Sequence, residues 1–334
     1  MKRTTFLGSA LAVSLAGRAV AARAETDQVT IAKQYGVSFL PLLLMEHDKL
    51  VEKHAKQLGI PDLKVNYAEF SGPNVINDGL LSGAVTFAAV GAPSLITLYT
   101  KTNGALKAVS AMTTYPLYLN VRNPAIRSIK DFTDKDKIAV PAAKISTQAI
   151  VLQMAAAKAF GQENYARLDP FTVSMSHPDG LIALKNAANG VDAHFTTSPF
   201  HEEELQFPGV RTLFTSYDVL GGPATAITIV ASAKFRDGNP KAYRAFYDAL
   251  GEAIASINKD KRAAAKLYVD LTKGTTETAD GVYAVISKPD YAYTLAPAKV
   301  QQTAEFMAKI GTIPKAPASW KEMFFPEVQG LSGS

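Results

Sequence analysis

Residues 65–95 contain the same short pattern twice. An apolar stretch over 65–70 leads into Ser71-Gly72-Pro73, and a second stretch over 85–90 leads into Gly91-Ala92-Pro93. Serine and glycine favour the cap of a helix and proline fits its first turn, so each stretch predicts a strand followed by a helix. This alternation predicts an α/β fold with a mainly parallel sheet. Neighbouring helix starts point free N–H groups into one crevice, and neither turn carries a nucleophile or a base, so we expect the crevice to bind a small molecule unchanged.

The first 24 residues have the pattern of an export signal. Lys2 and Arg3 are basic, residues 6–15 are apolar, and small residues precede Glu25 as at a signal-peptide cleavage site. The apolar run is too short for a transmembrane anchor. We therefore predict that residues 1–24 are a cleaved signal peptide and that the mature chain begins at Glu25.

Cysteine is absent from the 334 residues. The chain therefore has no disulfide, thiol nucleophile, Cys-ligated zinc or acylated cysteine. Four of the 35 basic residues and none of the acidic ones lie in the first 24, so the rest of the chain is close to neutral. No basic run interleaved with aromatics marks a nucleic-acid interface. We expect a periplasmic monomer with no metal, no cofactor and no nucleic-acid partner.

The strand and helix pattern continues from residue 29 and predicts two units. The first comprises 25–114 and 224–334, and the second comprises 115–223. The chain is expected to cross between them near Tyr115 and Gly222. A single helix is predicted over 41–58, and the C-terminal third is mainly helical. There an apolar stripe at spacings of three and four predicts a core-facing helix, at Tyr243, Phe246, Leu250, Ile254 and Ile257.

Four segments carry a resemblance to a known family: residues 71–94, 128–141, 183–200 and 320–324. Through the order and spacing of these segments, the chain resembles the solute-binding proteins of ABC transporters in the nitrate, sulfonate and taurine class. The resemblance implies the two-lobed, type II periplasmic binding protein fold, with mainly parallel sheets flanked by helices and two hinge crossings. It also implies a protein without enzymatic activity. Such a protein would capture a small organic solute, such as a sulfonate or carboxylate, and deliver it to a membrane permease.

Three alternatives stand beside this expectation, and the first two stay open. The same class includes binders of thiamine-pyrimidine precursors, so the solute could be an aromatic heterocycle. A ligand-presenting partner of a sensor kinase would use the same closed lobes. An enzyme that makes the thiamine pyrimidine shares the fold, but it requires a cysteine-rich iron motif, which a chain without cysteine cannot supply.

By position, the resemblance places candidate solute contacts at strand ends and helix starts. Those of the first lobe are Tyr35, Phe39, Ser71, Gly72, Asn74, Gly91 and Ala92, with Tyr115 at the crossing. Those of the second lobe are Lys144, Ser146, Thr147, His177, Phe195, Thr196 and Thr197.

These candidates have different expected roles. Ser71 and Ser146 can cap a helix, donate to a solute, or do both. Lys144 would add a positive charge beside the second of these turns. The four aromatic candidates can stack on a flat solute or simply pack within a lobe. His177, at a predicted helix start, is the one histidine that we retain as a contact.

The other histidines are interpreted as solvent-exposed. His47 and His54 lie seven residues apart, on one face of the helix predicted over 41–58. His194 and His201 both lie before the acidic run 202–204, and His201 is adjacent to it. Their spacing is not that of a metal site, so we interpret this segment as the solvated, acidic start of a helix.

Overall fold

A computed structural model describes residues 25–186, 190–272 and 277–334, so the predicted signal peptide lies outside the described residues. Its strands form two sheets. The first contains β1 (Gln28–Lys33), β2 (Lys64–Glu69), β3 (Phe87–Val90), β4 (Leu106–Thr114), β10 (Thr225–Ser232) and β11 (Ala292–Tyr293). The second contains β5 (Tyr118–Val121), β6 (Ile138–Val140), β7 (Thr172–Ser174), β8 (Ala193–Thr196) and β9 (Arg211–Thr215).

Each sheet has a parallel side and an antiparallel side. In the order β11-β4-β10-β3-β1-β2, strand β1 is parallel to both neighbours, and Ile31 lies opposite Tyr67 and Phe87. In the order β7-β6-β8-β5-β9, strand β6 is likewise parallel to both neighbours. Strands β10 and β5 run antiparallel to their neighbours. The carboxyl ends of β1, β2 and β3 therefore lie at one edge of the first sheet, and those of β6, β7 and β8 at one edge of the second.

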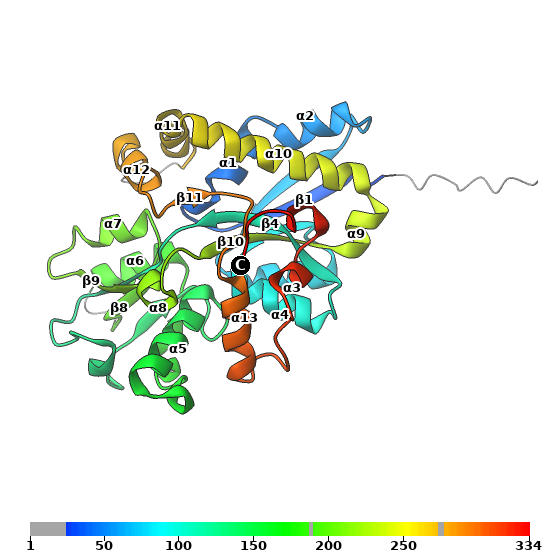
Figure 1. Ribbon diagram of the computed structural model, residues 1–334. Helices are drawn as coiled ribbons and strands as arrows, with labels where there is room; N and C mark the ends of the chain where they lie inside the picture. Colours follow the sequence, from blue (N-terminus) through cyan, green and yellow to red (C-terminus); the bar gives the residue numbers. More distant parts are fainter. Residues whose placement is uncertain (1–24, 187–189, 273–276) are drawn as a thin grey trace, which may run out of the picture.

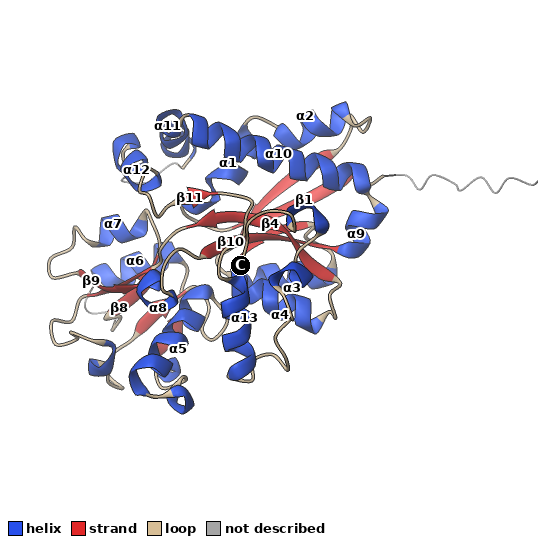
Figure 2. Cartoon of the chain, in the orientation of Figure 1, coloured by secondary structure: helices blue, strands red, loops and turns tan. Residues whose placement is uncertain are grey.

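Helices flank both sheets, as Figure 2 shows in blue. Those associated with the first sheet are α1 (Leu40–His47), α2 (Leu50–Gln57), α3 (Pro73–Ser82), α4 (Ala92–Lys101), α9 (Ala233–Gly238), α10 (Pro240–Lys259), α11 (Lys261–Leu271), α12 (Ala279–Ile286) and α13 (Val300–Lys309). Those of the second are α5 (Thr147–Phe160), α6 (His177–Lys185), α7 (Phe200–Glu204) and α8 (Ser216–Leu220). In the part of the chain that the structure describes, no helix is both long and apolar enough to cross a bilayer.

The helix predicted over 41–58 is in fact two helices. Lys49 has a left-handed backbone, with φ 50° and ψ 46°, and this conformation separates α1 from α2. A residue in that region cannot continue a right-handed helix. His47 therefore ends one helix and His54 lies on the next, where its ring contacts Glu252 at 2.7 Å. The prediction that the two histidines share a helix face was wrong.

The predicted apolar stripe of α10 is buried, and this prediction is confirmed. Phe246 stacks on Phe87 of β3, with ring centroids 3.8 Å apart and planes inclined by 6°. Offset stacking of buried rings adds to the free energy gained from their burial. The stripe thus fixes α10 against the first sheet, beside α1 and α2 (Figure 1).

The chain crosses between the sheets twice. Residues 115–117 connect β4 to β5, and residues 221–224 connect α8 to β10. Strand β10 returns to the middle of the first sheet, where Thr228 lies opposite Val90 and Ala111. The division into 25–114 with 224–334, and 115–223, stays a prediction.

Candidate functional site

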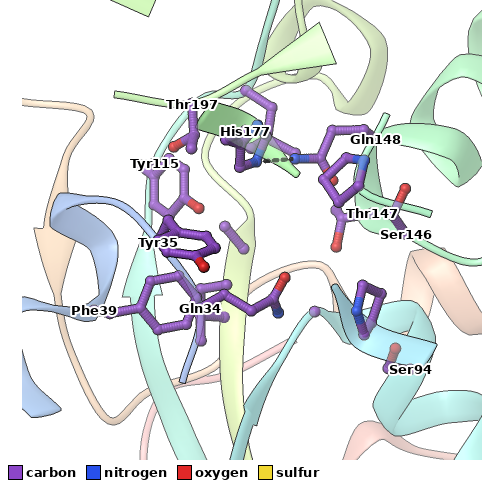
Figure 3. A pocket seen from close by; sticks show the side chains of 16 residues that line it. Gln34, Tyr35, Phe39, Ser94, Tyr115, Ser146, Thr147, Gln148, His177 and Thr197 are labelled. Carbon is purple, nitrogen blue, oxygen red and sulfur yellow. Dashed lines mark hydrogen bonds between the residues drawn. The ribbon is translucent and has the colours of Figure 1, made fainter. Parts of the chain in front are cut away.

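A cavity of about 40 Å³ lies between the two sheets, at the carboxyl ends of their parallel strands (Figure 3). Side chains from both sheets and from the first crossing enclose it. On the side of the first sheet it is lined by Gln34, Tyr35, Phe39, Pro73, Gly91, Ser94, Ala226 and Ile227. On the other sides it is lined by Tyr115, Leu117, Pro141, Ser146, Thr147, Gln148, His177 and Thr197.

Four helices begin at this cavity. Pro73 is the first residue of α3, and Gly91 caps α4. Ser146 caps α5 by accepting a hydrogen bond from the Ala149 N–H at 3.2 Å, and His177 is the first residue of α6. Unpaired N–H groups and the positive ends of helix dipoles favour anions and other acceptor-rich groups at such positions. Among the described residues that line the cavity, none is lysine, arginine, aspartate or glutamate.

Three glycines bring the sheets into contact around the cavity. Gly36, Gly72 and Gly91 follow β1, β2 and β3 respectively. A Cβ atom on Gly36 would lie 3.1 Å from the Ser198 carbonyl oxygen, and one on Gly72 would lie 2.9 Å from the Pro141 carbonyl oxygen. A Cβ atom on Gly91 would lie only 2.1 Å from the Thr147 Oγ1. We call these three contacts the glycine seam.

Tyr115 lies in the first crossing and forms one wall of the cavity. Its ring stacks on Tyr291, with centroids 5.2 Å apart. Burial raises the pKa of its phenol, while the neighbouring hydroxyls of Ser38 and Thr197 act in the opposite direction. Tyr115 therefore keeps its proton and presents a neutral ring and hydroxyl.

A buried polar network leads away from the cavity into the second lobe. Gln148 Nε2 lies 3.3 Å from His177 Nε2, and His177 Nδ1 lies 3.1 Å from His194 Nε2. His194 Nδ1 lies 2.5 Å from Glu204 Oε1, and Glu204 Oε2 accepts a hydrogen bond from Asn120 Nδ2 at 2.8 Å. His194, Glu204 and Asn120 have no exposed surface.

The interpretation of His194, His201 and residues 202–204 as a solvated helix start was therefore wrong. Helix α7 packs against β5 and α6, so His201 and Glu204, at opposite ends of the helix, face inward. The sequence HEEE does not reveal this because a five-residue helix is too short for a periodic pattern.

Burial also controls the charge of the network. The pKa of His177 lies well below its ordinary value of 6.5, first because the ring is desolvated and second because His194 lies beside it. The pKa of His201 is lowered to about 4, chiefly by burial and then by Lys288. The His201 ring stacks on Tyr118, with centroids 3.7 Å apart. Both rings are therefore neutral near pH 7.

The neutral state of His201 predicts a loss of stability in acid. The unfolded chain takes up a proton on this side chain near pH 6.5, whereas the folded chain does so only near pH 4. Stability is therefore fully present above pH 6.5 and is lost as the pH falls towards 4, by about 2 kcal/mol between pH 7 and pH 5. Urea titrations at these two pH values should show this loss, and a smaller one for His201→Phe. An equal loss in both proteins would contradict the assignment.

Eight of the predicted contacts line the cavity: Tyr35, Phe39, Gly91, Tyr115, Ser146, Thr147, His177 and Thr197. Gly72 belongs to the glycine seam, and Ala92 is buried directly after Gly91. Neither these two nor the other five line it. Their role as solute contacts, like that of the eight, stays a prediction.

The five outlying residues have simple structural reasons for their positions. Ser71 and Asn74 are exposed, because Gly72 and not Ser71 caps α3. Lys144 is also exposed, on a left-handed turn with φ 66°. Phe195 and Thr196 are buried within β8. The Phe195 ring lies edge-on to the Phe214 ring, with centroids 5.7 Å apart.

Sequence analysis missed three polar residues of the lining: Gln34, Ser94 and Gln148. Gln34 directly follows β1, and Gln148 is the second residue of α5. Ser94 lies in the first turn of α4, 3.4 Å from Asn77 Nδ2. A polar residue at a strand end or in a first helical turn was therefore the signal that could have found all three.

Comparison with known proteins gives a fold and no closer relationship. No protein-family model and no curated protein matches the sequence. Among solved structures, the alkanesulfonate-binding protein SsuA from Xanthomonas axonopodis, bound to MOPS, superposes with a TM-score of 0.70 at 18% identity, over 87% of this chain and 96% of that one. The periplasmic nitrate-binding protein NrtA from Synechocystis superposes with a TM-score of 0.67 at 14% identity, over 90% and 84%.

This chain has the periplasmic binding protein fold. The periplasmic aliphatic sulphonate binding protein SsuA from Escherichia coli shares it, with a TM-score of 0.63 at 18% identity over 90% of this chain and 98% of that one. The predicted fold, with two lobes, helices flanking both sheets and two crossings, is confirmed. The sheets are mixed, however, and not mainly parallel as predicted, because β10 and β5, which follow the crossings, pair antiparallel with their neighbours. In a periplasmic binding protein fold, the cavity described above lies in the cleft between the lobes.

Proposed function

We propose that the protein is the periplasmic solute-binding component of an ABC importer, which captures a small solute between its lobes and delivers it to a membrane permease. One observation carries this proposal: the cavity is enclosed by the carboxyl ends of parallel strands from both sheets. Such edges are where open α/β sheets bind ligands. A solute placed there touches both lobes and so favours their closed arrangement over an open one.

The lining favours a solute with a small, acceptor-rich group of at most one negative charge. Four helix starts supply N–H groups and positive dipole ends, and Thr147 and Ser94 supply hydroxyls. No charged side chain of the described lining balances a second negative charge. A water-sized site needs roughly 10–15 Å³ of such volume. The cavity of about 40 Å³ therefore has room for a sulfonate, carboxylate or similar head group.

The remainder of a larger solute can extend into a second cavity. This outer cavity of about 510 Å³ shares Gln34 and Tyr35 with the inner one. Leu43 and Tyr268 line it from the first lobe, and Leu181 from the second. The wall also contains charged residues, among them Lys33 and Glu203. Walls that combine apolar and polar side chains in this way suit an organic chain or ring. We therefore propose an organic anion in preference to an inorganic one.

An aromatic heterocycle is the second candidate, because Tyr35 and Phe39 both line the inner cavity beside Tyr115. Aromatic rings bind flat solutes by stacking. This candidate shares the binding function, so the two differ only in the solute.

We propose binding without catalysis, in the periplasm and as a monomer. The described lining carries no carboxylate, and the chain contains no thiol. His177 is neutral and engaged with Gln148 and His194. Removal of residues 1–24 would leave Glu25 as the first residue, whose carboxylate accepts hydrogen bonds from the N–H groups of Lys241 and Ala242 at the start of α10.

A thermal-shift screen tests this proposal. We expect at least one sulfonate, carboxylate, nitrate salt or pyrimidine to raise the melting temperature of the refolded protein, because a ligand at a hundred times its Kd stabilises the folded state by about 2.7 kcal/mol. Tyr35→Ala should abolish the rise, whereas His54→Ala, on α2 and outside the cavity lining, should retain it. A rise that is equal in all three proteins would place the solute outside the cleft, and no rise with any compound would contradict the proposal.

A further inference from the structure

A continuous row of side chains connects the cleft to a buried carboxylate. It begins at Gln148 in the first turn of α5, passes through His177 at the start of α6 and His194 on β8, and ends at Glu204 of α7. Figure 3 shows Gln148 and His177 joined at the cleft end. Each side chain comes from a different element, so the row exists only in the folded lobe.

With a carboxylate at its far end and a single proton on each imidazole, the row has one direction of hydrogen bonding. An ionised carboxylate only accepts hydrogen bonds. Glu204 Oε1 therefore accepts from the N–H at His194 Nδ1, which leaves His194 Nε2 as an acceptor. That nitrogen accepts from the N–H at His177 Nδ1, which leaves His177 Nε2 as an acceptor in turn. The Gln148 amide then donates to it.

Asn120 supports the same direction from the opposite side of Glu204. Thr212 Oγ1 donates to Asn120 Oδ1 at 2.9 Å, and His201 Nδ1 lies 3.2 Å from the same oxygen. The amide nitrogen of Asn120 is thereby directed at Glu204 Oε2, to which it donates at 2.8 Å. Both carboxylate oxygens accept, so two donors satisfy the buried charge.

We propose that the Glu204–His194 pair acts as a positioning device that holds His177 in the Nδ1–H tautomer, whose unprotonated Nε2 accepts from the Gln148 amide and so leaves the carbonyl of Gln148 as a hydrogen-bond acceptor for the solute. The imidazole of His177 is oriented by the group bonded to its other nitrogen, as in other histidine sites. His194 is itself held in place, because a Cβ atom on Gly180 of α6 would lie 2.6 Å from its ring.

The consequence is a specificity rule for the solute. The solute group at the Gln148 carbonyl must be an N–H or O–H donor, while acceptor-rich groups belong at the helix starts of α3, α4 and α5. A solute that carries both, such as an amino- or hydroxy-substituted acid, satisfies the two parts of the cleft. A site that hydrogen-bonds a donor rejects the analogue lacking it strongly, since its own buried groups are then left unpaired. This rule rests on the proposed function, whereas the tautomer does not.

Nitrogen NMR of the solute-free, refolded protein tests the tautomer directly. Long-range proton–nitrogen correlation spectra separate protonated from unprotonated ring nitrogens. In the parent protein at pH 7.5, we expect both His177 and His194 to have a protonated Nδ1 and an unprotonated Nε2. A protonated Nε2 on His177 would overturn the proposal, whatever the outcome of any solute screen. The parent spectrum decides this without a variant.

The Glu204→Gln substitution should reverse the row. Asn120 still donates, so the new amide must face it with its oxygen and present its NH₂ group to His194 Nδ1. His194 then carries its proton on Nε2 and so does His177, whose Nε2 signal should move fully into the protonated range.

Two control variants separate this effect from a general one. Glu204→Asp, which keeps the carboxylate, should retain the parent tautomer. Glu252→Gln, which changes the partly exposed His54–Glu252 pair, is the matched control and should leave His177 unchanged. A purely structural role of Glu204 predicts no change of tautomer in Glu204→Gln, and that result would also overturn the proposal.

Discussion

Replacing Gly91 with alanine should weaken solute binding about 5- to 150-fold. The backbone of Gly91, with φ −67° and ψ 158°, suits alanine, so the substitution introduces no strain of its own. The added Cβ atom, however, would lie 2.1 Å from Thr147 Oγ1 when the sheets are together. Overpacking of this kind costs about 1–3 kcal/mol. This clash exists only where the two sheets meet, so most of the cost falls on the closed, solute-bound state. A cost of about 1.4 kcal/mol corresponds to a tenfold change in Kd.

Two further proteins separate this effect from a general one. Gly251→Ala, on α10, places a Cβ atom with no other atom within 4 Å and should bind as the parent does. In the double variant Gly91→Ala with Thr147→Ala, the clashing oxygen is gone, so the lobes can approach again. Binding should recover in part, since the Thr147 hydroxyl proposed to contact the solute is also gone. Calorimetric titration with a solute found in the thermal-shift screen gives the Kd values of the parent and of the three variants. Equal affinity of Gly91→Ala and the parent would show that the glycine seam does not have to close around the solute.

Replacing Glu204 with alanine should lower the free energy of unfolding by about 3–5 kcal/mol, the range for removal of one partner from a buried ion-paired or hydrogen-bonded charge. The substitution leaves the N–H at His194 Nδ1 and the amide of Asn120 without an acceptor in a site that has no exposed surface. It also leaves an unfilled space beside β8. Urea denaturation at pH 7.5 measures the loss.

The matched control for this prediction lies on the surface of the first lobe. Glu252 contacts His54 at 2.7 Å and Lys53 at 2.6 Å, but these groups are partly exposed. Exposed ion pairs contribute about 0–1 kcal/mol, so Glu252→Ala should change the free energy of unfolding little. If the two variants lose the same amount, the carboxylate of Glu204 is not the buried anchor of the network.

The fold could be predicted because its signals are local. Strands β2, β3 and β7 end at the cleft and are each followed by a glycine or serine cap and a proline in the first turn of a helix, as at Gly72-Pro73 and Gly91-Ala92-Pro93. The repeated strand and helix indicate parallel pairing, and Tyr115 lies in the first segment that crosses to the second sheet. These features depend on residues only a few positions apart, which a sequence displays directly.

The rest of the site could not be predicted because it depends on contacts between distant segments. Thr147 and Gly91 are 56 positions apart in the chain and come into contact only because the two sheets face each other. Glu204 contacts His194 and Asn120 in the interior of the second lobe. The acidic run 202–204 gives no indication that either residue is its partner. Similarly, the left-handed conformation of Lys49 that divides α1 from α2 has no marker such as glycine.

Native mass spectrometry of the protein purified from the periplasm without refolding tests most directly whether a solute is held between the lobes. We predict that part of the parent protein and of Gly251→Ala carries a small non-covalent adduct, that the adduct is lost on denaturation, and that it is missing from Gly91→Ala. The contradicting result is an adduct retained equally by all three proteins, because a solute that tolerates a side chain at Gly91 is not enclosed by the glycine seam.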